Sequence, residues 1–364
     1  MSIKAAVYPF DRDFVPVFHS KELLKSIEIV SLISLPGWGY TDGIGISSKE
    51  THPVICDFEI GIEMCDVLWI CDSWNTCPFE QFILPAVRNA VEKQKKIFLT
   101  RNLTPTEISK IRVIAGDSLL TLEEYQEEKI PQTTQSNRLL SRIDTPVIYV
   151  AGVAQNTKKF EIQATLKGRL EQDGYNVLWL SSRKEALLMG GHSLPSFLLQ
   201  NEISENRKIL SFNNYVCCLE KEEKPSVILI GIPGSIMLYS KKYSHDFGIL
   251  GYEMLQAIEP DCLVLGSLYV PYCDVTYFEG IERAIENKFD IPVDVHVLSE
   301  FTLDKSESLS AKEMTYLTLD ESFVENIVKK MDDLRIFSLV DERDKDNLYK
   351  AVIQMMTGDM PILL

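Results

Sequence analysis

One segment restricts the possible folds more than any other, because it joins an apolar run to a helical run through a glycine and two lysines. The apolar run is Val147–Ala151, which is typical of a buried strand, and Glu161–Gln172 is rich in helix-forming residues. Between them stands Gly152-Val153-Ala154-Gln155-Asn156-Thr157-Lys158-Lys159-Phe160. Gly174 ends the helix before a further apolar run, Asn176–Leu180. A strand, a loop, a helix and a second strand in this order predict a parallel α/β sheet.

The loop matches the P-loop pattern G-x-x-x-x-G-K-[ST] only in part. Gly152 stands at the first glycine and Lys158 at the lysine, whereas Thr157 replaces the second glycine and Lys159 replaces the Ser or Thr. A threonine resists the torsions that curl backbone N–H groups around a phosphate, and a lysine opposes the Mg²⁺ that the hydroxyl normally binds. Two lysines at a helix N-terminus can pair with an anion directly. We therefore expect these residues and Asn156 to form an anion site without a metal; an ordinary strand-to-helix turn is the alternative.

A second glycine turn follows the next apolar strand. Ser226–Ile230 leads into Gly231-Ile232-Pro233-Gly234-Ser235-Ile236. A hydrolysing P-loop enzyme usually ends this strand with an acid that holds the Mg²⁺ water, but Ile230 stands there. Because α/β proteins bind ligands at the carboxyl ends of their strands, we expect Gly234 and Ser235 to close the far side of the anion site. A tight loop without a ligand remains the alternative.

Apolar runs bounded by turn residues alternate with helical stretches along the whole chain, which indicates parallel sheets. At 364 residues the chain is long enough for two domains, and a polar, charged stretch at Leu122–Asp144 separates them. We therefore expect an α/β protein with two Rossmann-like parallel-sheet domains, the second P-loop NTPase-like. The N-terminal domain would span 1–125, a linker 126–144, and the second domain with its C-terminal helices 145–364. The strands expected in the first domain are Ala5–Pro9, Ile29–Leu35, Val67–Cys71 and Ile97–Thr100.

The formal net charge of −16 argues against two classes of partner. A surface this negative repels phosphate backbones and anionic lipids, so we expect neither nucleic acid nor a membrane surface as a partner. A single bound nucleotide is still compatible with the charge, because one loop of backbone N–H groups holds phosphates locally. The N-terminal residues do not form a signal peptide, and no stretch is long enough to span a bilayer. We therefore expect a cytoplasmic protein.

The cysteines do not follow a metal-binding pattern. All eight should be reduced in the cytoplasm, and Cys65, Cys71 and Cys77 are spaced by six residues, unlike the C-x₂-C spacing of a zinc site. We interpret them as small buried side chains around a strand and expect no metal. The alternative is a metal site that adds three nearby side chains: His52, Cys56 and Asp72.

Two further turns carry polar side chains. Asp72-Ser73-Trp74-Asn75 follows an apolar strand, at the sheet edge where ligands bind, so Trp74 is a candidate stacking or interface residue; it could equally cap the core. His192 stands in the turn Gly190-Gly191-His192-Ser193 and could act in acid–base chemistry. The sequence reveals no acid or nucleophile to partner this histidine.

Val147–Leu180 and Val227–Leu265 together resemble the P-loop domain of a bacterial family of uncharacterised proteins with a Rossmann-like domain in front. In that family the helix after the lysine-bearing loop ends in "G-Y", as at Gly174-Tyr175, and a later helix precedes "P-D-x-x-V-L", as at Pro260–Leu265. The family's acid falls on Ile230 in this chain. The resemblance therefore implies the fold but not metal-dependent catalysis.

Nearly the whole chain also resembles the clostridial peptide maturation system proteins. The resemblance rests on three segments: Asn156–Gln163, Ile230–Met237 and Asp72–Asn75. Proteins of that group are encoded beside short ribosomally made peptide precursors and the radical enzymes that tailor them. The resemblance implies an accessory or modifying protein in the maturation of such a peptide, with the precursor or a tailoring enzyme as its partner.

Three functions are compatible with these patterns. In the first, the degenerate loop binds ATP, GTP or another anion through Lys158 and Lys159, without Mg²⁺, while the N-terminal domain contacts the peptide or a partner enzyme. In the second, the protein is an ATP-dependent ligase or kinase-like enzyme acting on a peptide, and Asp246 or Glu253 supplies the missing acid. In the third, the fold has lost its ligand and serves as a scaffold. A homo-oligomer is compatible with each.

Overall fold

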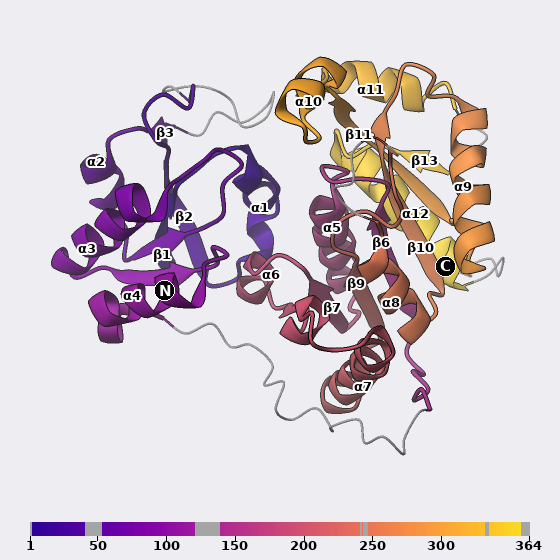
Figure 1. Ribbon diagram of the computed structural model, residues 1–364, viewed down its shortest axis with the longest axis horizontal. Helices are drawn as coiled ribbons and strands as arrows, with labels where there is room; N and C mark the ends of the chain where they lie inside the picture. The colour runs from indigo at the N-terminus through magenta and orange to yellow at the C-terminus, as the bar shows by residue number, and fades with distance from the viewer. Residues whose placement is uncertain are drawn as a thin grey trace. The chain divides into compact units, whose positions relative to one another are not determined.

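The computed structural model describes residues 2–40, 53–120, 139–240, 242, 247–331 and 335–357. The chain forms two compact units: unit 1 comprises residues 1–124 and 183–190, and unit 2 comprises residues 125–182 and 191–364 (Figure 1). The sequence predicts a second domain that continues unbroken from residue 145, whereas residues 183–190 cluster with unit 1. Of the predicted linker 126–144, residues 139–144 are described.

Unit 1 contains a parallel sheet with helices connecting its strands. Its strands are β1 (Ile3–Tyr8), β2 (Ile27–Ile33), β3 (Val54–Ile55), β4 (Val67–Ile70) and β5 (Lys96–Leu99). Its helices are α1 (Val15–His19), α2 (Phe58–Ile62), α3 (Leu84–Glu92), α4 (Pro105–Ala115) and α6 (Glu185–Leu188). All neighbouring strands are parallel in the order β3-β2-β1-β4-β5, so the order reverses between β1 and β4. The carboxyl ends of strands at such a reversal form the usual ligand crevice of open α/β sheets.

Unit 2 contains a larger sheet with the P-loop strand in its middle. Its strands are β6 (Val147–Gly152), β7 (Val177–Ser181), β8 (His192–Ser193), β9 (Val227–Gly231), β10 (Cys262–Tyr269), β11 (Val295–Leu303), β12 (Tyr316–Thr318) and β13 (Ile336–Phe337). The order is β12-β11-β10-β6-β9-β7-β8, with β13 also paired to β11. Only β12 runs antiparallel to its neighbour among the described strands. β6 is buried along its whole length, as expected for a central strand.

Helices cover both faces of the sheet of unit 2. They are α5 (Lys159–Gln172), α7 (Glu205–Glu223), α8 (Ile249–Ala257), α9 (Val275–Phe289), α10 (Lys305–Ala311), α11 (Glu321–Val328) and α12 (Glu342–Thr357). One core cluster joins α7, α8 and α9 to side chains such as Tyr149 and Leu265. The connection from β6 to β7 runs across the sheet in one direction, and those from β9 to β10 and from β10 to β11 run in the other. Because such connections are right-handed, α5 lies on the face opposite α8 and α9. On that face it contacts α12.

The architecture confirms the predicted α/β fold class with two Rossmann-like sheets, which are parallel apart from β12 among the described strands. The four strands predicted for the first domain all form, with ends that differ by at most two residues. The sheet also contains β3, which the sequence did not predict because it is only two residues long. Among the described helices, none combines the length and the apolar character that crossing a membrane requires.

Candidate functional site

The loop between β6 and α5 folds around the side chain of Thr157. This side chain is buried, and its hydroxyl donates a hydrogen bond to the carbonyl oxygen of Ala154 over 3.2 Å. A Cβ atom on Gly152 would lie 2.1 Å from Thr157 Oγ1, and one on Gly266 of β10 would lie 2.3 Å from the Thr157 carbonyl oxygen. Both positions must therefore be glycine for Thr157 to pack inside the loop.

The chain turns at the two residues that flank Thr157. Asn156 and Lys158 have φ angles of 58° and 57°, and both lie in the left-handed region. The sequence predicts that Thr157 resists the curl of a P-loop, but its neighbours Asn156 and Lys158 supply the left-handed torsions instead. Asparagine tolerates this conformation, whereas a lysine pays roughly 1–2 kcal/mol for it. The loop is curled, by a different route from that of a P-loop with two glycines.

Several backbone N–H groups of this loop have no protein acceptor. In the part of the chain that the structure describes, the N–H groups of Ala154, Asn156, Thr157 and Lys158 donate no hydrogen bond. They lie just before the 14-residue helix α5, whose dipole favours negative charge at this end. Unpaired N–H groups beside a helix N-terminus are the elements from which proteins build anion sites.

Lys158 is turned inward. Its Nζ lies 2.9 Å from Glu300 Oε2 on β11 and 3.5 Å from Glu161 Oε2 in the first turn of α5, and all three side chains are largely buried. Burial alone would lower the pKa of Lys158, but the carboxylates of Glu161 and Glu300 outweigh burial and hold this pKa above the usual lysine range. The lysine is therefore a charged group that already has anionic partners.

Lys159 fastens the loop to the second glycine turn. Its Nζ donates hydrogen bonds to the carbonyl oxygens of Ala154, over 3.2 Å, and of Gly234. The backbone N–H of Ile236 donates to the carbonyl oxygen of Gly152 over 2.8 Å. Ser235, which stands between Gly234 and Ile236 in the sequence, is buried. The structure thus brings the turn from Gly234 to Ile236 against the Gly152–Lys159 segment, and closure of an anion site by Gly234 and Ser235 stays a prediction. The contact of Lys159, however, is with carbonyl oxygens and not with a site open to an anion.

The acid that a hydrolysing P-loop enzyme needs is absent from the end of β9. Ile230 is fully buried at that position. Of the two predicted substitutes, Asp246 lies outside the described residues, and Glu253 lies within α8, where its buried carboxylate pairs with Lys208 of α7 at 3.8 Å. Within the described ranges, no three or more His, Cys, Asp or Glu side chains are grouped so that they could hold a metal ion.

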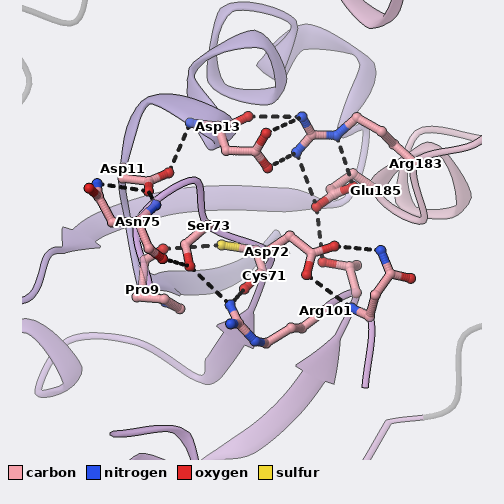
Figure 2. A network of polar contacts seen from close by, with 12 residues as sticks. Pro9, Asp11, Asp13, Cys71, Asp72, Ser73, Asn75, Arg101, Arg183 and Glu185 are labelled. Atoms are coloured by element: carbon pink, nitrogen blue, oxygen red, sulfur yellow. Dashed lines mark hydrogen bonds and ion pairs between the residues drawn. The ribbon is translucent and has the colours of Figure 1, made fainter. Parts of the chain in front are cut away.

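The Asp72–Asn75 turn lies at the carboxyl ends of the strands of unit 1, where the strand order reverses (Figure 2). Asn75 donates to Asp11 Oδ2 twice, from its backbone N–H over 2.8 Å and from its side-chain amide over 3.1 Å. Burial raises the pKa of Asp11, and the hydrogen bonds from Asn75 partly oppose this. Trp74 is 47% exposed at this edge, so it does not cap the core.

The other polar groups of this turn bind the loop that follows β5. Asp72 accepts hydrogen bonds from the backbone N–H and the side-chain amide of Asn102, over 3.1 and 2.7 Å. The guanidinium of Arg101 donates to the carbonyl oxygen of Cys71 over 3.0 Å and to Ser73 Oγ over 3.2 Å. These groups, predicted as a ligand-binding edge, therefore fasten neighbouring loops of unit 1 to one another.

Residues 183–190, which we call the strap, complete the same network (Figure 2). The guanidinium of Arg183 binds the two carboxylate oxygens of Asp13, at 3.3 and 3.0 Å, and pairs with Glu185 at 3.3 Å. Glu185 is buried and also accepts a hydrogen bond from Thr100 Oγ1 over 3.2 Å. The sequence did not indicate Arg183, Glu185 or Glu300, because their partners Asp13, Thr100 and Lys158 lie far away along the chain.

The remaining candidates have structural partners. His192 Nε2 of β8 lies 2.6 Å from Glu223 Oε1 at the end of α7, an acid that the sequence did not single out. Cys65, Cys71 and Cys77 are buried free thiols. Burial raises the pKa of Cys77 to about 11 and that of Cys71 well above the ordinary value, so both are protonated at neutral pH. Protonated thiols are poor nucleophiles and poor metal ligands.

Comparison with known proteins finds structural likeness without sequence likeness. No protein family and no curated protein matches the sequence. The structure is similar to that of a DUF1611 family protein from Anabaena variabilis, with a TM-score of 0.59 and 12% identity over 97% of this chain and 100% of that one. At this identity the likeness extends to the fold alone.

Two further structures share less. A plasmid partition protein from Borrelia burgdorferi has a TM-score of 0.36 and 10% identity, over 58% of this chain and 99% of that one. A nucleotide-binding protein from Archaeoglobus fulgidus, solved with ADP, has a TM-score of 0.30 and 12% identity, over 60% of this chain and 92% of that one. These low scores carry no argument about function. The chain thus shares its overall α/β fold with a DUF1611 family protein.

Proposed function

We propose that the protein is a cytoplasmic accessory or modifying protein in the maturation of a ribosomally synthesised peptide, and that unit 2 binds a nucleotide or another phosphate-bearing anion. The unpaired N–H groups of the Gly152–Lys158 loop, at the N-terminus of α5, carry the binding part of this proposal. The pathway part rests on the resemblance of three segments to peptide maturation system proteins: Asn156–Gln163, Ile230–Met237 and Asp72–Asn75.

Binding without Mg²⁺-dependent hydrolysis fits the surroundings of the loop best. Lys159 stands where a hydroxyl would ligate Mg²⁺, and its ammonium group already contacts the carbonyl oxygens of Ala154 and Gly234. Ile230 offers no carboxylate for the water that the metal would hold. The ammonium of Lys159 would repel a Mg²⁺ ion at this position, and Ile230 supplies no carboxylate to bind it. The proposed ligand is therefore held by backbone N–H groups and lysine, as a metal-free nucleotide or other anion.

Calorimetric titration with ATP, GTP, ADP and GDP tests the binding part. We expect saturable heat for at least one nucleotide and a clear loss of affinity in Lys158→Ala. Absence of heat with all four nucleotides, with and without Mg²⁺, would sink the nucleotide proposal. Steady ATP turnover that disappears in Lys158→Ala would instead favour an ATP-dependent ligase or kinase-like enzyme acting on the peptide.

A ligand-free scaffold is the second candidate, and one observation favours it. Lys158 and Lys159 both have partners inside the protein, and Thr157 fills the base of the loop, so the loop is stable without a ligand. Processing of the precursor peptide in cells separates the two candidates. The scaffold predicts normal processing in Lys158→Ala, provided that the variant accumulates like the wild type, whereas an anion-dependent protein predicts a processing defect.

A further inference from the structure

The acid that pairs with the loop lysine comes from a strand that is not adjacent to the loop. β10 lies between β6 and β11, and Glu300 stands in the later part of β11. The pairing of these two strands shifts at this point: Ser267 pairs with Leu298, but Tyr269 pairs with Thr302. β11 therefore carries extra residues between the two pairs, and Glu300 is one of them. Such bulges redirect side chains and are frequent beside functional sites.

Glu300 is held in this position by its own backbone. Its carbonyl oxygen accepts a hydrogen bond from the N–H of Leu319 over 2.7 Å, and its side chain is only 14% exposed. Glu300 lies 2.9 Å from Lys158 Nζ. Glu161, in the helix that follows the loop, lies farther away, at 3.5 Å. A charged hydrogen bond that is shielded from water is strong and little screened by salt.

We propose that Glu300 is a built-in competitor for the anion, which holds Lys158 until a phosphate group displaces it. This inference rests on the proposed function, because it concerns the same loop. The unpaired N–H groups and the Lys158 ammonium belong to adjacent residues. A phosphate group that binds both the N–H groups and the ammonium must therefore replace Glu300 as the partner of Lys158. Removal of the Glu300 charge should therefore raise anion affinity, which is the opposite of what a binding residue does when it is lost.

Two variants and one control separate this role from a structural one. Glu300→Gln removes the charge and keeps the shape, and Glu300→Asp keeps the charge but withdraws it by one methylene. Glu313→Gln removes an exposed acid that makes no hydrogen bond or ion pair with the loop among the described residues, and it serves as the control. Full-length proteins are titrated with ADP and with inorganic pyrophosphate. Reaction of Lys158 with an amine-acylating reagent is followed by peptide mass spectrometry, with the exposed Lys312 as the internal standard.

We expect Glu300→Gln to bind ADP about tenfold or more tightly and to expose Lys158 to faster acylation. Glu300→Asp should lie between it and the wild type, and Glu313→Gln should match the wild type. Equal ADP affinity in wild type and Glu300→Gln would overturn the competitor role while leaving nucleotide binding intact. Unchanged acylation of Lys158 in both Glu300 variants would overturn it even if no nucleotide bound. Failure of every variant to bind any anion would overturn this inference and the proposed function together.

Discussion

Thr157 occupies a glycine position without adopting a glycine conformation, because Asn156 and Lys158 turn the chain on either side of it. The sequence motif identified the position of the loop and the missing hydroxyl correctly. It could not reveal that Thr157 packs under the loop, since that depends on Gly266 in a distant strand. Nor could it reveal that Lys158 points inward, because its partner Glu300 is far away in the sequence and close only in the folded protein. The local charges were thus predictable, whereas the backbone torsions of the loop and the partners of its side chains were not.

Asn156 provides a test of the left-handed turn. Asn156→Ala should lower the free energy of unfolding by about 1 kcal/mol, because alanine is strained at this φ angle, whereas Asn156→Gly should be close to neutral. Urea unfolding of the two variants beside the wild type checks this. Equal stability of the alanine and glycine variants would mean that the turn is not left-handed at Asn156.

Glu253 provides a pH test, because both of its carboxylate oxygens are buried without a hydrogen bond among the described residues. Burial raises its pKa, and the charge of Lys208 opposes this. A carboxyl group with a raised pKa stabilises the fold below its unfolded pKa of about 4.3, and this contribution is lost as the pH rises toward the folded value. Glu253→Gln should therefore gain stability relative to the wild type between pH 4 and pH 7, by about 1 kcal/mol. A constant difference across that range would contradict the raised pKa.

At the scale of elements, alternation of apolar and helical segments predicts most of the fold, since each strand and helix carries its own pattern. The strands Val67–Ile70 and Val227–Gly231 form close to where the sequence indicates. Pairing between strands is different: the bulge in β11 and the place of β12 depend on neighbours and leave no local signal. The features that shape the site are mainly of this second kind.

Gly266 of β10 tests the closeness of β10 to the loop. Gly266→Ala would bring Cβ to 2.3 Å from the backbone oxygen of Thr157, so the loop must move. We expect a loss of about 2 kcal/mol in the free energy of unfolding. Gly280→Ala in α9 is the matched control, since a Cβ there meets nothing within 4 Å and alanine favours a helix. The contrary result is a Gly266→Ala protein as stable as Gly280→Ala.

At the scale of the whole molecule, the strap makes unit 1 discontinuous in sequence. In the sequence the strap lies between β7, which ends at Ser181, and β8, which begins at His192. These two strands pair with each other in unit 2. Its Arg183 and Glu185 close the network at the carboxyl ends of the strands of unit 1 (Figure 2). Unit 1 therefore depends on residues from the second half of the chain, although the composition of the two halves suggests separate domains.

Replacement of Arg183 tests this dependence. Arg183→Ala would leave Glu185 buried without its cation, and we expect a loss of about 3 kcal/mol in the free energy of unfolding, with faster proteolysis within residues 183–190. Lys184→Ala, the neighbouring change, should stay within about 0.5 kcal/mol of the wild type. Equal protease resistance of the two variants would show that the strap does not hold unit 1 together.

Metal-free binding of an anion by the loop is the proposal on which the other functional predictions depend. It is tested by the affinity for ADP, measured by calorimetry in excess Mg²⁺ and again in excess chelator, for the wild type and Lys158→Ala. We expect equal wild-type affinity in both conditions and a loss of about tenfold or more in Lys158→Ala. Binding that requires Mg²⁺, or that is unaffected by loss of Lys158, would contradict it.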